Sequence, residues 1–303
     1  MMARSATKAP SKALLAILDE LYAGNVVDLP PILLGEAREW GLPLTHWQGS
    51  HRLTPPLEPW QRSLLAEQLQ LPLDAIGLWP LCDSSNTRVL ESPHLVLGLA
   101  EAQWAGRGRQ GRPWHSPFGL HLYLSLRVSP PKESLGVFPL VAALGIWKVL
   151  SPWVPELWVK WPNDLWIGQQ KLAGVLLEGR YRAEHQDWVL GLGLNVGKDP
   201  GLPPTAISLA DTSWQGQRRD LLCKIWAQWQ QDFPQLTRHG FAPFRERWWQ
   251  ADRLRGQAVY VEQGNQAQVW QVLDLENDGR LRVGNGQEVH LLQSAQLRLR
   301  PLP

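Results

Sequence analysis

The chain has 303 residues, more than one compact domain usually needs, and its hydrophobic content of 44% is enough to bury a core. Its 30 basic and 28 acidic side chains give a formal net charge of only +2, which excludes a general polyanion-binding surface. Cys82 and Cys223 have no paired spacing, which argues against a disulfide framework or a zinc site.

Neither a signal peptide nor a membrane span is expected. The apolar patch at 13–18 is short and is followed by Asp19 and Glu20. The most apolar stretch, 138–150, is too short to cross a bilayer and contains Lys148. The sequence therefore predicts a soluble cytoplasmic protein with no membrane contact.

The N-terminal part, residues 1–56, predicts a small domain. Apolar residues at helical spacing indicate a helix over 14–23 and a shorter one over 32–40. A small hairpin, or wing, follows at 44–53. Residues 1–12 carry three bases and no acid and are expected to form a loose tail, and prolines after the hairpin form a linker.

The central part, 60–252, shows strand-like and helix-like segments in succession. The expected elements are a helix at 60–71, strands at 76–81, 95–100 and 120–128, a helix at 133–150, a strand at 157–161, two strands meeting near Gly168, a strand at 188–196, and helices at 219–236 and 241–249.

A run of short polar side chains, 83–87, directly follows the strand at 76–81. Such a run makes a good helix N-cap, and it is also a good site for the polar groups of a ligand. The sequence leaves both interpretations open.

The loop Gly106–Arg112 alternates three glycines with three arginines. Glycine allows a ligand to approach the main chain closely, and arginine offers a rigid fork of donors to carboxylate or phosphate. A solvated basic loop and an RNA-binding segment are the alternatives. Because the run is not repeated and lies between two predicted strands, we expect a positioned loop that wraps a small anionic ligand.

Two further polar groups lie at strand ends. Lys171 is expected to open a strand seven residues after Asp164, although a solvated turn lysine is the commoner case. Asn195 ends the strand at 188–196, whose glycines permit close approach of another group.

The C-terminal part, 256–303, changes to short strands separated by turns, which predicts a small barrel. The expected strands are 257–262, 268–275, 280–284, 288–292 and 296–300.

Taken together, these motifs resemble those of biotin protein ligases of the bacterial three-domain type, with matching order and spacing over roughly 76–210. The motifs are Asp83-Ser84-Ser85-Asn86, Gln103 with the Gly106–Arg112 loop and Trp114, Lys160-Trp161-Pro162-Asn163-Asp164, Lys171-Leu172-Ala173-Gly174, and Gly191–Asn195.

The resemblance implies an α+β fold: a winged-helix-like domain at 1–56, a catalytic domain with a mixed sheet at 60–252, and an SH3-like barrel at 256–303. It implies a ligase that condenses biotin with ATP and Mg²⁺ to biotinyl-5′-AMP. The enzyme then transfers biotin to one lysine of the biotin carboxyl carrier protein of acetyl-CoA carboxylase. The oligomeric state stays open, a homodimer included.

Joining two anions requires cations, and Arg107, Arg109 and Lys171 are available. The resemblance implies that Lys171, Arg109 and Asp164 are catalytic, with Asp164 either holding the metal or accepting the proton of the acceptor lysine; no metal ligand is assigned. Biotin contacts are implied for Ser84, Ser85, Asn86, Gln103, Arg107, Gly108, Arg109 and Lys171, and ATP or adenylate contacts for Arg107, Arg109, Arg112, Trp114, Asn163 and Asn195.

The sequence departs from the family at three places. Ser85 replaces a threonine but keeps the hydroxyl, and Ala206 stands where some members place a tryptophan over the adenine; Trp214 is nearby. The N-terminal part is too short for a separate second helix before the last helix and wing. Residues 14–53 also carry five acids against two bases, a net charge of −3, so specific DNA binding is not expected. A lipoate–protein ligase and a regulator that senses biotinyl-adenylate are the remaining alternatives.

Overall fold

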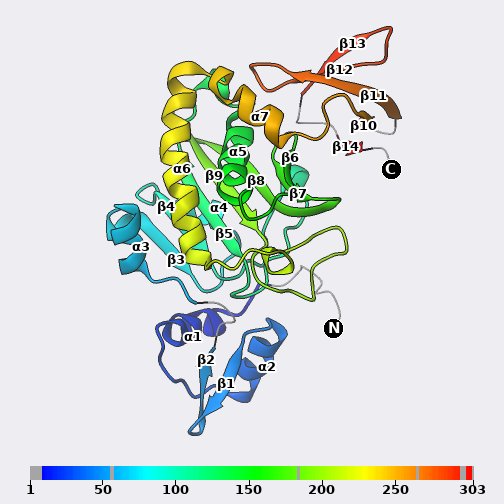
Figure 1. Ribbon diagram of the computed structural model, residues 1–303. Helices are drawn as coiled ribbons and strands as arrows, with labels where there is room; N and C mark the ends of the chain where they lie inside the picture. Colours follow the sequence, from blue (N-terminus) through cyan, green and yellow to red (C-terminus); the bar gives the residue numbers. More distant parts are fainter. Residues whose placement is uncertain (1–8, 55–57, 183–184, 264–265, 294–297, 302–303) are drawn as a thin grey trace. The chain divides into compact units, whose positions relative to one another are not determined.

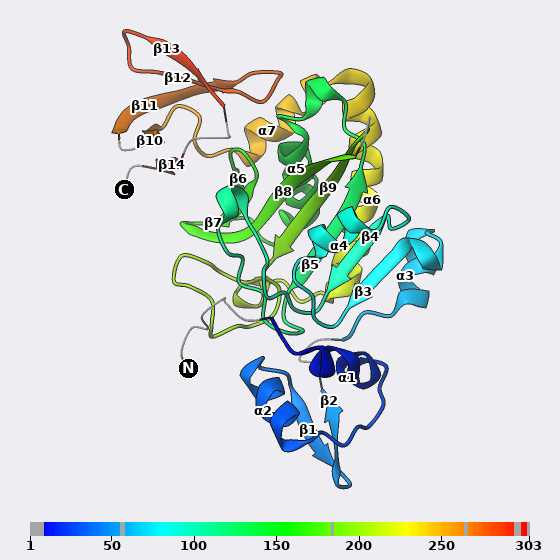
Figure 2. The ribbon, with the colours of Figure 1, turned by 180° about the vertical axis from the view of Figure 1, so that it is seen from behind.

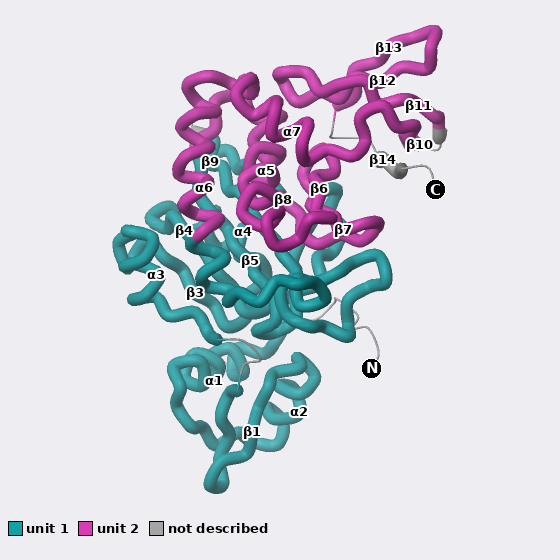
Figure 3. Tube along the Cα trace, viewed as in Figure 1, with its two compact units in different colours: residues 1–128, 176–223 teal, residues 129–175, 224–303 magenta. Residues whose placement is uncertain are grey.

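The computed structural model describes residues 9–54, 58–182, 185–263, 266–293 and 298–301 (Figures 1 and 2). The chain folds as two compact units, residues 1–128 with 176–223 and residues 129–175 with 224–303 (Figure 3). Strand β8 (Gln170–Arg182) passes from the second unit into the first. The division into three domains expected from the sequence stays a prediction.

The N-terminal part of the first unit contains the expected elements. They are α1 (Lys12–Tyr22), α2 (Pro31–Glu39), β1 (Leu44–Trp47) and β2 (Ser50–Leu53). The Ser11 hydroxyl caps α1 by accepting the Leu14 N–H at 3.1 Å. Residues 23–30 between the helices contain no further helix, as the short span predicted. The expected tail falls mostly outside the described residues.

The N-terminal elements share a hydrophobic core with the central part of the same unit. Leu14, Leu18 and Leu21 lie on one face of α1 because their spacing follows the helical period. They pack in one buried cluster with Leu81 and Phe118. These helices are therefore held by packing against the central part.

The sheet of the first unit is mixed, as expected. Its strand order is β3 (Ile76–Trp79), β4 (Leu97–Ala100), β5 (Leu122–Val128), β9 (His185–Leu194) and the end of β8. β3 and β4 are parallel, and β4–β5 and β5–β9 are antiparallel. Helix α3 (Arg62–Leu69) precedes β3, and α4 (Ser85–Glu91) lies between β3 and β4 in the chain.

The second unit begins with a buried helix. α5 (Phe138–Leu150) has nine buried residues of its 13, and it contacts α6 (Arg218–His239), which lies beside it in Figures 1 and 2. Trp229 of α6 donates its indole N–H to the Ala142 carbonyl at 3.0 Å. The expected helix from residue 133 was too long, since α5 begins next to Pro139, and proline fits only the first turn of a helix.

The second unit also contains antiparallel strands, β6 (Leu157–Lys160), β7 (Asp164–Ile167) and the start of β8. β7 and β8 are the two strands that were predicted to meet near Gly168. Helix α7 (Arg245–Ala251) follows a short 3-10 turn, where one helix over 241–249 was expected. No helix among the described residues is both long enough and apolar enough to cross a bilayer.

The C-terminal part forms a five-stranded antiparallel sheet, consistent with the expected SH3-like barrel. Its strands are β10 (Ala258–Gln263), β11 (Gln266–Leu275), β12 (Leu281–Gly284), β13 (Val289–Leu292) and β14 (Arg298–Pro301), in the order β13-β12-β11-β10-β14. The Trp161 indole N–H donates to the Gly279 carbonyl at 2.9 Å, which ties this sheet to the loop after β6.

A buried ion pair joins distant segments of the first unit. Arg218 Nη1 lies 2.7 Å from Glu101 Oε2, and both side chains are almost fully buried, with 2% and 1% exposed. The Tyr22 hydroxyl donates to Glu101 Oε1 at 2.5 Å. Burial and the negative charge of Glu101 raise the pKa of Tyr22, so this hydroxyl keeps its proton.

We expect Glu101→Gln to lower the free energy of unfolding by about 3 kcal/mol or more, because it leaves the Arg218 charge buried without a counter-charge. Urea unfolding measures this loss. Arg219→Ala is the matched control, since Arg219 pairs at 2.7 Å with Glu58, whose side chain is 42% exposed, and pairs in contact with water contribute less than about 1 kcal/mol. Equal losses in the two variants would contradict the prediction.

Candidate active site

The polar run 83–87 after β3 is held by backbone contacts, and the hydroxyl of its N-cap residue does not cap the helix that follows. Cys82 forms a parallel bridge with Gln103, and α4 begins at Ser85. Ser84 is the N-cap residue, yet its side chain makes no capping hydrogen bond. Ser84, Ser85 and Asn86 are only 4–5% exposed. Capping alone therefore does not explain these buried side chains.

Five buried or half-buried side chains form one hydrogen-bonded group. This group is here called the polar cluster and contains Ser85, Asn86, Gln103, Ser125 and Glu178. The Ser85 N–H donates to Gln103 Oε1 at 2.8 Å, and the Ser85 hydroxyl lies 3.1 Å from the same oxygen. Ser125 Oγ lies 2.7 Å from Ser85 Oγ and 2.5 Å from Asn86 Oδ1. Asn86 Nδ2 donates to Glu178 Oε2 at 2.7 Å. The structure thus brings three of the predicted biotin residues together.

Ser125 and Glu178 were not predicted as site residues. Ser125 was assigned only to the strand expected at 120–128, and Glu178 lay outside the motifs that carried the resemblance. The available signal was a carboxylate directly after the apolar run 175–177, where burial of an unpaired charge is costly.

Glycines on β9 make room for the site, as the sequence predicted. A Cβ atom on Gly191 would lie 2.6 Å from Asn86 Oδ1, and one on Gly193 would overlap the Trp114 ring. No larger residue fits at either position without displacing these side chains. Glycine therefore allows Asn86 and Trp114 to lie directly against the strand.

The Gly-Arg loop closes on itself. Trp114 N–H donates to the Gly106 carbonyl at 2.8 Å, and Gly108 N–H donates to the Arg112 carbonyl at 2.7 Å. The turn of the loop is the short 3-10 segment Arg109–Gly111. Hence the loop is an ordered hairpin, which favours the prediction of a positioned loop over a solvated one.

Arg107 connects this loop to the polar cluster. Its Nη2 atom donates to Thr87 Oγ1 at 3.0 Å and lies 3.4 Å from Glu178 Oε1. One cation predicted for the ligand is therefore already next to the predicted biotin residues.

In the second unit, Lys171 is paired with Asp164. Lys171 Nζ lies 2.8 Å from Asp164 Oδ1, with the two side chains 30% and 22% exposed. The pairing of β7 with β8 shifts register next to Lys171, and a Cβ atom on Gly174 would lie 3.0 Å from Lys171 Nζ. Lys171 is therefore positioned by a carboxylate and is not a freely solvated turn lysine.

The two predicted asparagines bind the main chain. The Asn163 amide donates to the Val175 carbonyl, and Asn195 Nδ2 donates to the Ile207 carbonyl at 3.1 Å. Both side chains are buried. They hold neighbouring segments in place, and their direct contact with a nucleotide stays a prediction.

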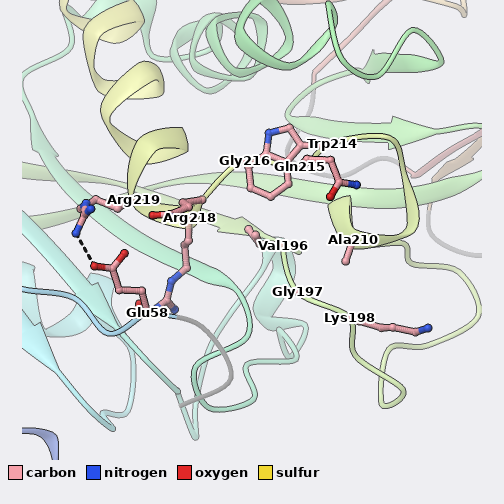
Figure 4. Close-up of a pocket in the computed structure, with 11 residues that line it drawn as sticks. Glu58, Val196, Gly197, Lys198, Ala210, Trp214, Gln215, Gly216, Arg218 and Arg219 are labelled. Atoms are coloured by element: carbon pink, nitrogen blue, oxygen red, sulfur yellow. Dashed lines mark hydrogen bonds and ion pairs between the residues drawn. The ribbon is translucent and has the colours of Figure 1, made fainter. Parts of the chain in front are cut away.

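A pocket of about 460 Å³ lies in the first unit next to the end of β9. Val196, Ala210 and Trp214 line it together with the start of α6, and Figure 4 shows the Glu58–Arg219 ion pair at one side. Trp214 thus lines this pocket, whereas Ala206 is not among the residues that line it. Within the described parts of the chain, no group of three or more His, Cys, Asp or Glu side chains could hold a metal ion.

Asp199 is held by two histidines. Val196 N–H donates to His121 Nδ1 at 3.2 Å, so the His121 Nε2 atom carries the proton and donates to Asp199 Oδ2 at 3.2 Å. His115 Nε2 lies 2.9 Å from the same oxygen. Burial would raise the pKa of Asp199. The hydrogen bonds from His121 and the Gly201 N–H, with the attraction of His115, outweigh it and lower the pKa to about 2.

A model of the biotin/lipoate A/B protein ligase family matches residues 81–195. The bifunctional ligase/repressor BirA of Escherichia coli (strain K12) is 30% identical over 278 residues, covering 84% of this chain and 85% of that protein. The biotin–[acetyl-CoA-carboxylase] ligase of Mycobacterium tuberculosis is 34% identical over 203 residues, covering 61% of this chain and 72% of that protein.

Among solved structures, the biotin protein ligase from Aquifex aeolicus in complex with biotin and ATP has the same fold, with a TM-score of 0.66 at 24% identity. The match covers 75% of this chain and 99% of that one. The chain therefore belongs to the biotin/lipoate A/B protein ligase family. Within it the chain is a biotin protein ligase, which confirms the class of enzyme that its motifs predicted.

We expect Asp199→Asn to lower the free energy of unfolding at pH 7 by about 2 kcal/mol, since a lowered folded-state pKa of a carboxyl stabilises the fold above its ordinary value of about 3.9. That contribution disappears as the pH falls from about 4 to about 2. Denaturant unfolding at pH 7 and at pH 3 tests this. A difference between variant and wild type that does not shrink at pH 3 would argue against it.

Proposed function

We propose that this biotin protein ligase joins biotin to ATP and then transfers biotin to one lysine of a biotin carboxyl carrier domain of acetyl-CoA carboxylase. The observation that carries the proposal is the polar cluster, whose buried donors and acceptors suit a ureido ring. The names of the relatives support the choice of carrier, and the Aquifex aeolicus structure contains biotin and ATP.

A ureido ring presents two N–H donors and one carbonyl acceptor. Hydroxyl groups such as those of Ser84 and Ser85 can both donate and accept, and the amides of Asn86 and Gln103 offer both functions as well. Because these groups are buried or half-buried, replacing their mutual hydrogen bonds by equivalent ones to the ligand leaves none unsatisfied. The cluster therefore selects a small polar ring of matching pattern.

The first step forms a mixed anhydride. An oxygen of the biotin carboxylate attacks the α-phosphorus of ATP, and the bond from that phosphorus to pyrophosphate breaks. Two anions must approach each other, so cations lower the barrier. In this proposal Lys171 neutralises the carboxylate, and Arg107, Arg109 and Arg112 of the Gly-Arg loop face the phosphate and acyl oxygens, with Gly108 allowing close approach.

In the second step the amine of the carrier lysine attacks the acyl carbon, AMP leaves, and the amine gives up a proton. Asp164 is the carboxylate available to accept that proton or to contact Mg²⁺, and it lies 2.8 Å from Lys171 Nζ. Mg²⁺ is usually bound by one or two protein carboxylates together with substrate phosphates, so its binding does not require a cluster of several acidic side chains. When bound, it would neutralise phosphate charge. Trp114, Asn163 and Asn195 are the expected nucleotide contacts.

The direct test combines purified protein, biotin, ATP, Mg²⁺ and a carrier domain, followed by the intact mass of the carrier. One biotin per carrier, dependent on ATP, is the expected result. A carrier of unchanged mass together with no biotin-dependent release of pyrophosphate would overturn the proposal.

We expect Lys171→Ala to slow biotinyl-adenylate formation by roughly 10²–10³-fold, because it removes a charge aimed at the reacting carboxylate. Biotin-dependent pyrophosphate release measures this rate. Lys148→Ala on the exposed face of α5 is the control and should keep the wild-type rate. A folded Lys171→Ala protein with a near-normal rate would remove Lys171 from this role.

The N-terminal part is proposed to support the enzyme without reading DNA. Its segment 14–53 has a net charge of −3, and α2 carries Glu36 and Glu39 with only Arg38. A helix that enters the major groove faces phosphates and needs cations. The buried contacts of α1 with Leu81 and Phe118 instead give this part a role in packing.

We expect no sequence-specific binding to promoter DNA of the organism's own biotin-synthesis genes. An anisotropy titration at physiological salt, with biotin and ATP present, measures it. Weak binding that fades steeply with salt agrees with contacts from the basic tail. Specific binding in the nanomolar range would show that two helices and a hairpin are enough for a repressor.

A further inference from the structure

Glu178 contacts both halves of the proposed biotin site. Its Oε2 atom accepts Asn86 Nδ2 at 2.7 Å, and its Oε1 atom lies 3.4 Å from Arg107 Nη2. The carboxylate thus bonds one side chain of α4 and one of the Gly-Arg loop. The proposed reaction gives Glu178 no chemical step.

The charge on Glu178 fixes which way the Asn86 amide points. An ionised carboxylate only accepts hydrogen bonds, so the NH₂ group of Asn86 must face it. The Asn86 oxygen then faces Ser125 Oγ, 2.5 Å away. Because an amide oxygen cannot donate, the proton of that bond belongs to Ser125.

This assignment determines the donor at the next contact. Ser125 has one hydroxyl proton, and it is committed to Asn86. The 2.7 Å contact between Ser125 Oγ and Ser85 Oγ therefore takes its proton from Ser85. Gln103 Oε1, 3.1 Å from the same hydroxyl, keeps the Ser85 backbone N–H at 2.8 Å as its donor. With its proton directed to Ser125, Ser85 offers lone pairs to a ligand and is set to accept an N–H.

Arg107 is the second group that Glu178 places. Arg107 also donates to Thr87 Oγ1 at 3.0 Å, so the first arm of the Gly-Arg loop is fastened to the first turn of α4. Loss of the carboxylate would leave the Thr87 bond as the remaining described contact of this guanidinium with α4 or β8.

We propose that Glu178 is a positioning residue that orients Asn86, Ser125 and Ser85 so that Ser85 accepts a ureido N–H, and that anchors Arg107 beside the ring. The proposal rests on the proposed function, because it takes biotin as the ligand. A cyclic urea with free N–H groups fits this orientation, whereas a ring that offers only acceptors there does not.

The test is titration calorimetry of the full-length protein with biotin in the absence of ATP. Glu178→Ala should bind biotin about 10- to 100-fold more weakly, the range expected for loss of a charge-assisted hydrogen bond. Glu178→Gln should lose about tenfold, since a neutral amide accepts either orientation of Asn86. If Glu178→Ala does not fold, Glu178→Gln decides the question.

A double-mutant cycle separates positioning from a general structural role. If Glu178 acts through Ser125, Glu178→Ala and Ser125→Ala combined should weaken binding no more than the worse single variant. Fully additive losses would overturn the relay. Asp187→Asn is the matched control: Asp187 Oδ1 pairs with Arg127 Nη1 at 3.3 Å in the same sheet at similar exposure, and its loss should leave biotin affinity unchanged.

Wild-type protein that does not bind biotin would contradict the proposed function itself. Wild-type binding together with Glu178→Ala and Glu178→Gln within twofold of it would overturn the role of Glu178 alone. Weaker binding in Asp187→Asn that matches Glu178→Gln would also overturn it, because loss of any acid in this sheet would then suffice.

Discussion

The buried Arg218–Glu101 ion pair is the contact on which the first unit depends. Glu101 follows β4 and lies two residues before Gln103, and Arg218 also donates to the His121 carbonyl just before β5. Both charges are out of water, so each requires the other. The pair therefore fixes the end of β4, which leads into Gln103, and the start of β5, which carries Ser125, and with them the polar cluster.

The cluster is organised as a satisfied network. Ser85, Asn86, Gln103 and Ser125 bond one another, so burial leaves few of their donors and acceptors unpaired. A ligand must exchange these bonds for its own, which makes recognition depend on a matching pattern of donors and acceptors more than on net attraction. Gly191 makes room for the cluster because it has no side chain, and Asn86 occupies the space that a Cβ atom would fill.

The N-terminal part is held in place by packing against the central part of the first unit. The Tyr22 hydroxyl bonds Glu101, and Leu14, Leu18 and Leu21 lie in the same buried cluster as Leu81. Losing α1 would expose apolar surface and remove one partner of the buried carboxylate. The buried contacts of α1 and the Tyr22–Glu101 hydrogen bond therefore stabilise the segment whether or not it contacts nucleic acid.

The sequence by itself determined the order of elements, the C-terminal strands and the motifs of the site, and the mixed sheet was expected from the resemblance of those motifs to a family. Periodicity and turn residues are local, and the motifs at Ser84–Asn86 and Lys171 are contiguous. It could not decide whether Ser84 only caps a helix, and it placed the start of α5 too early. Only the tertiary structure brought Glu178 to Asn86, 92 residues away, and Asp164 to Lys171. Those pairs depend on strand register and on the shift in β8, and neither is encoded in any single segment.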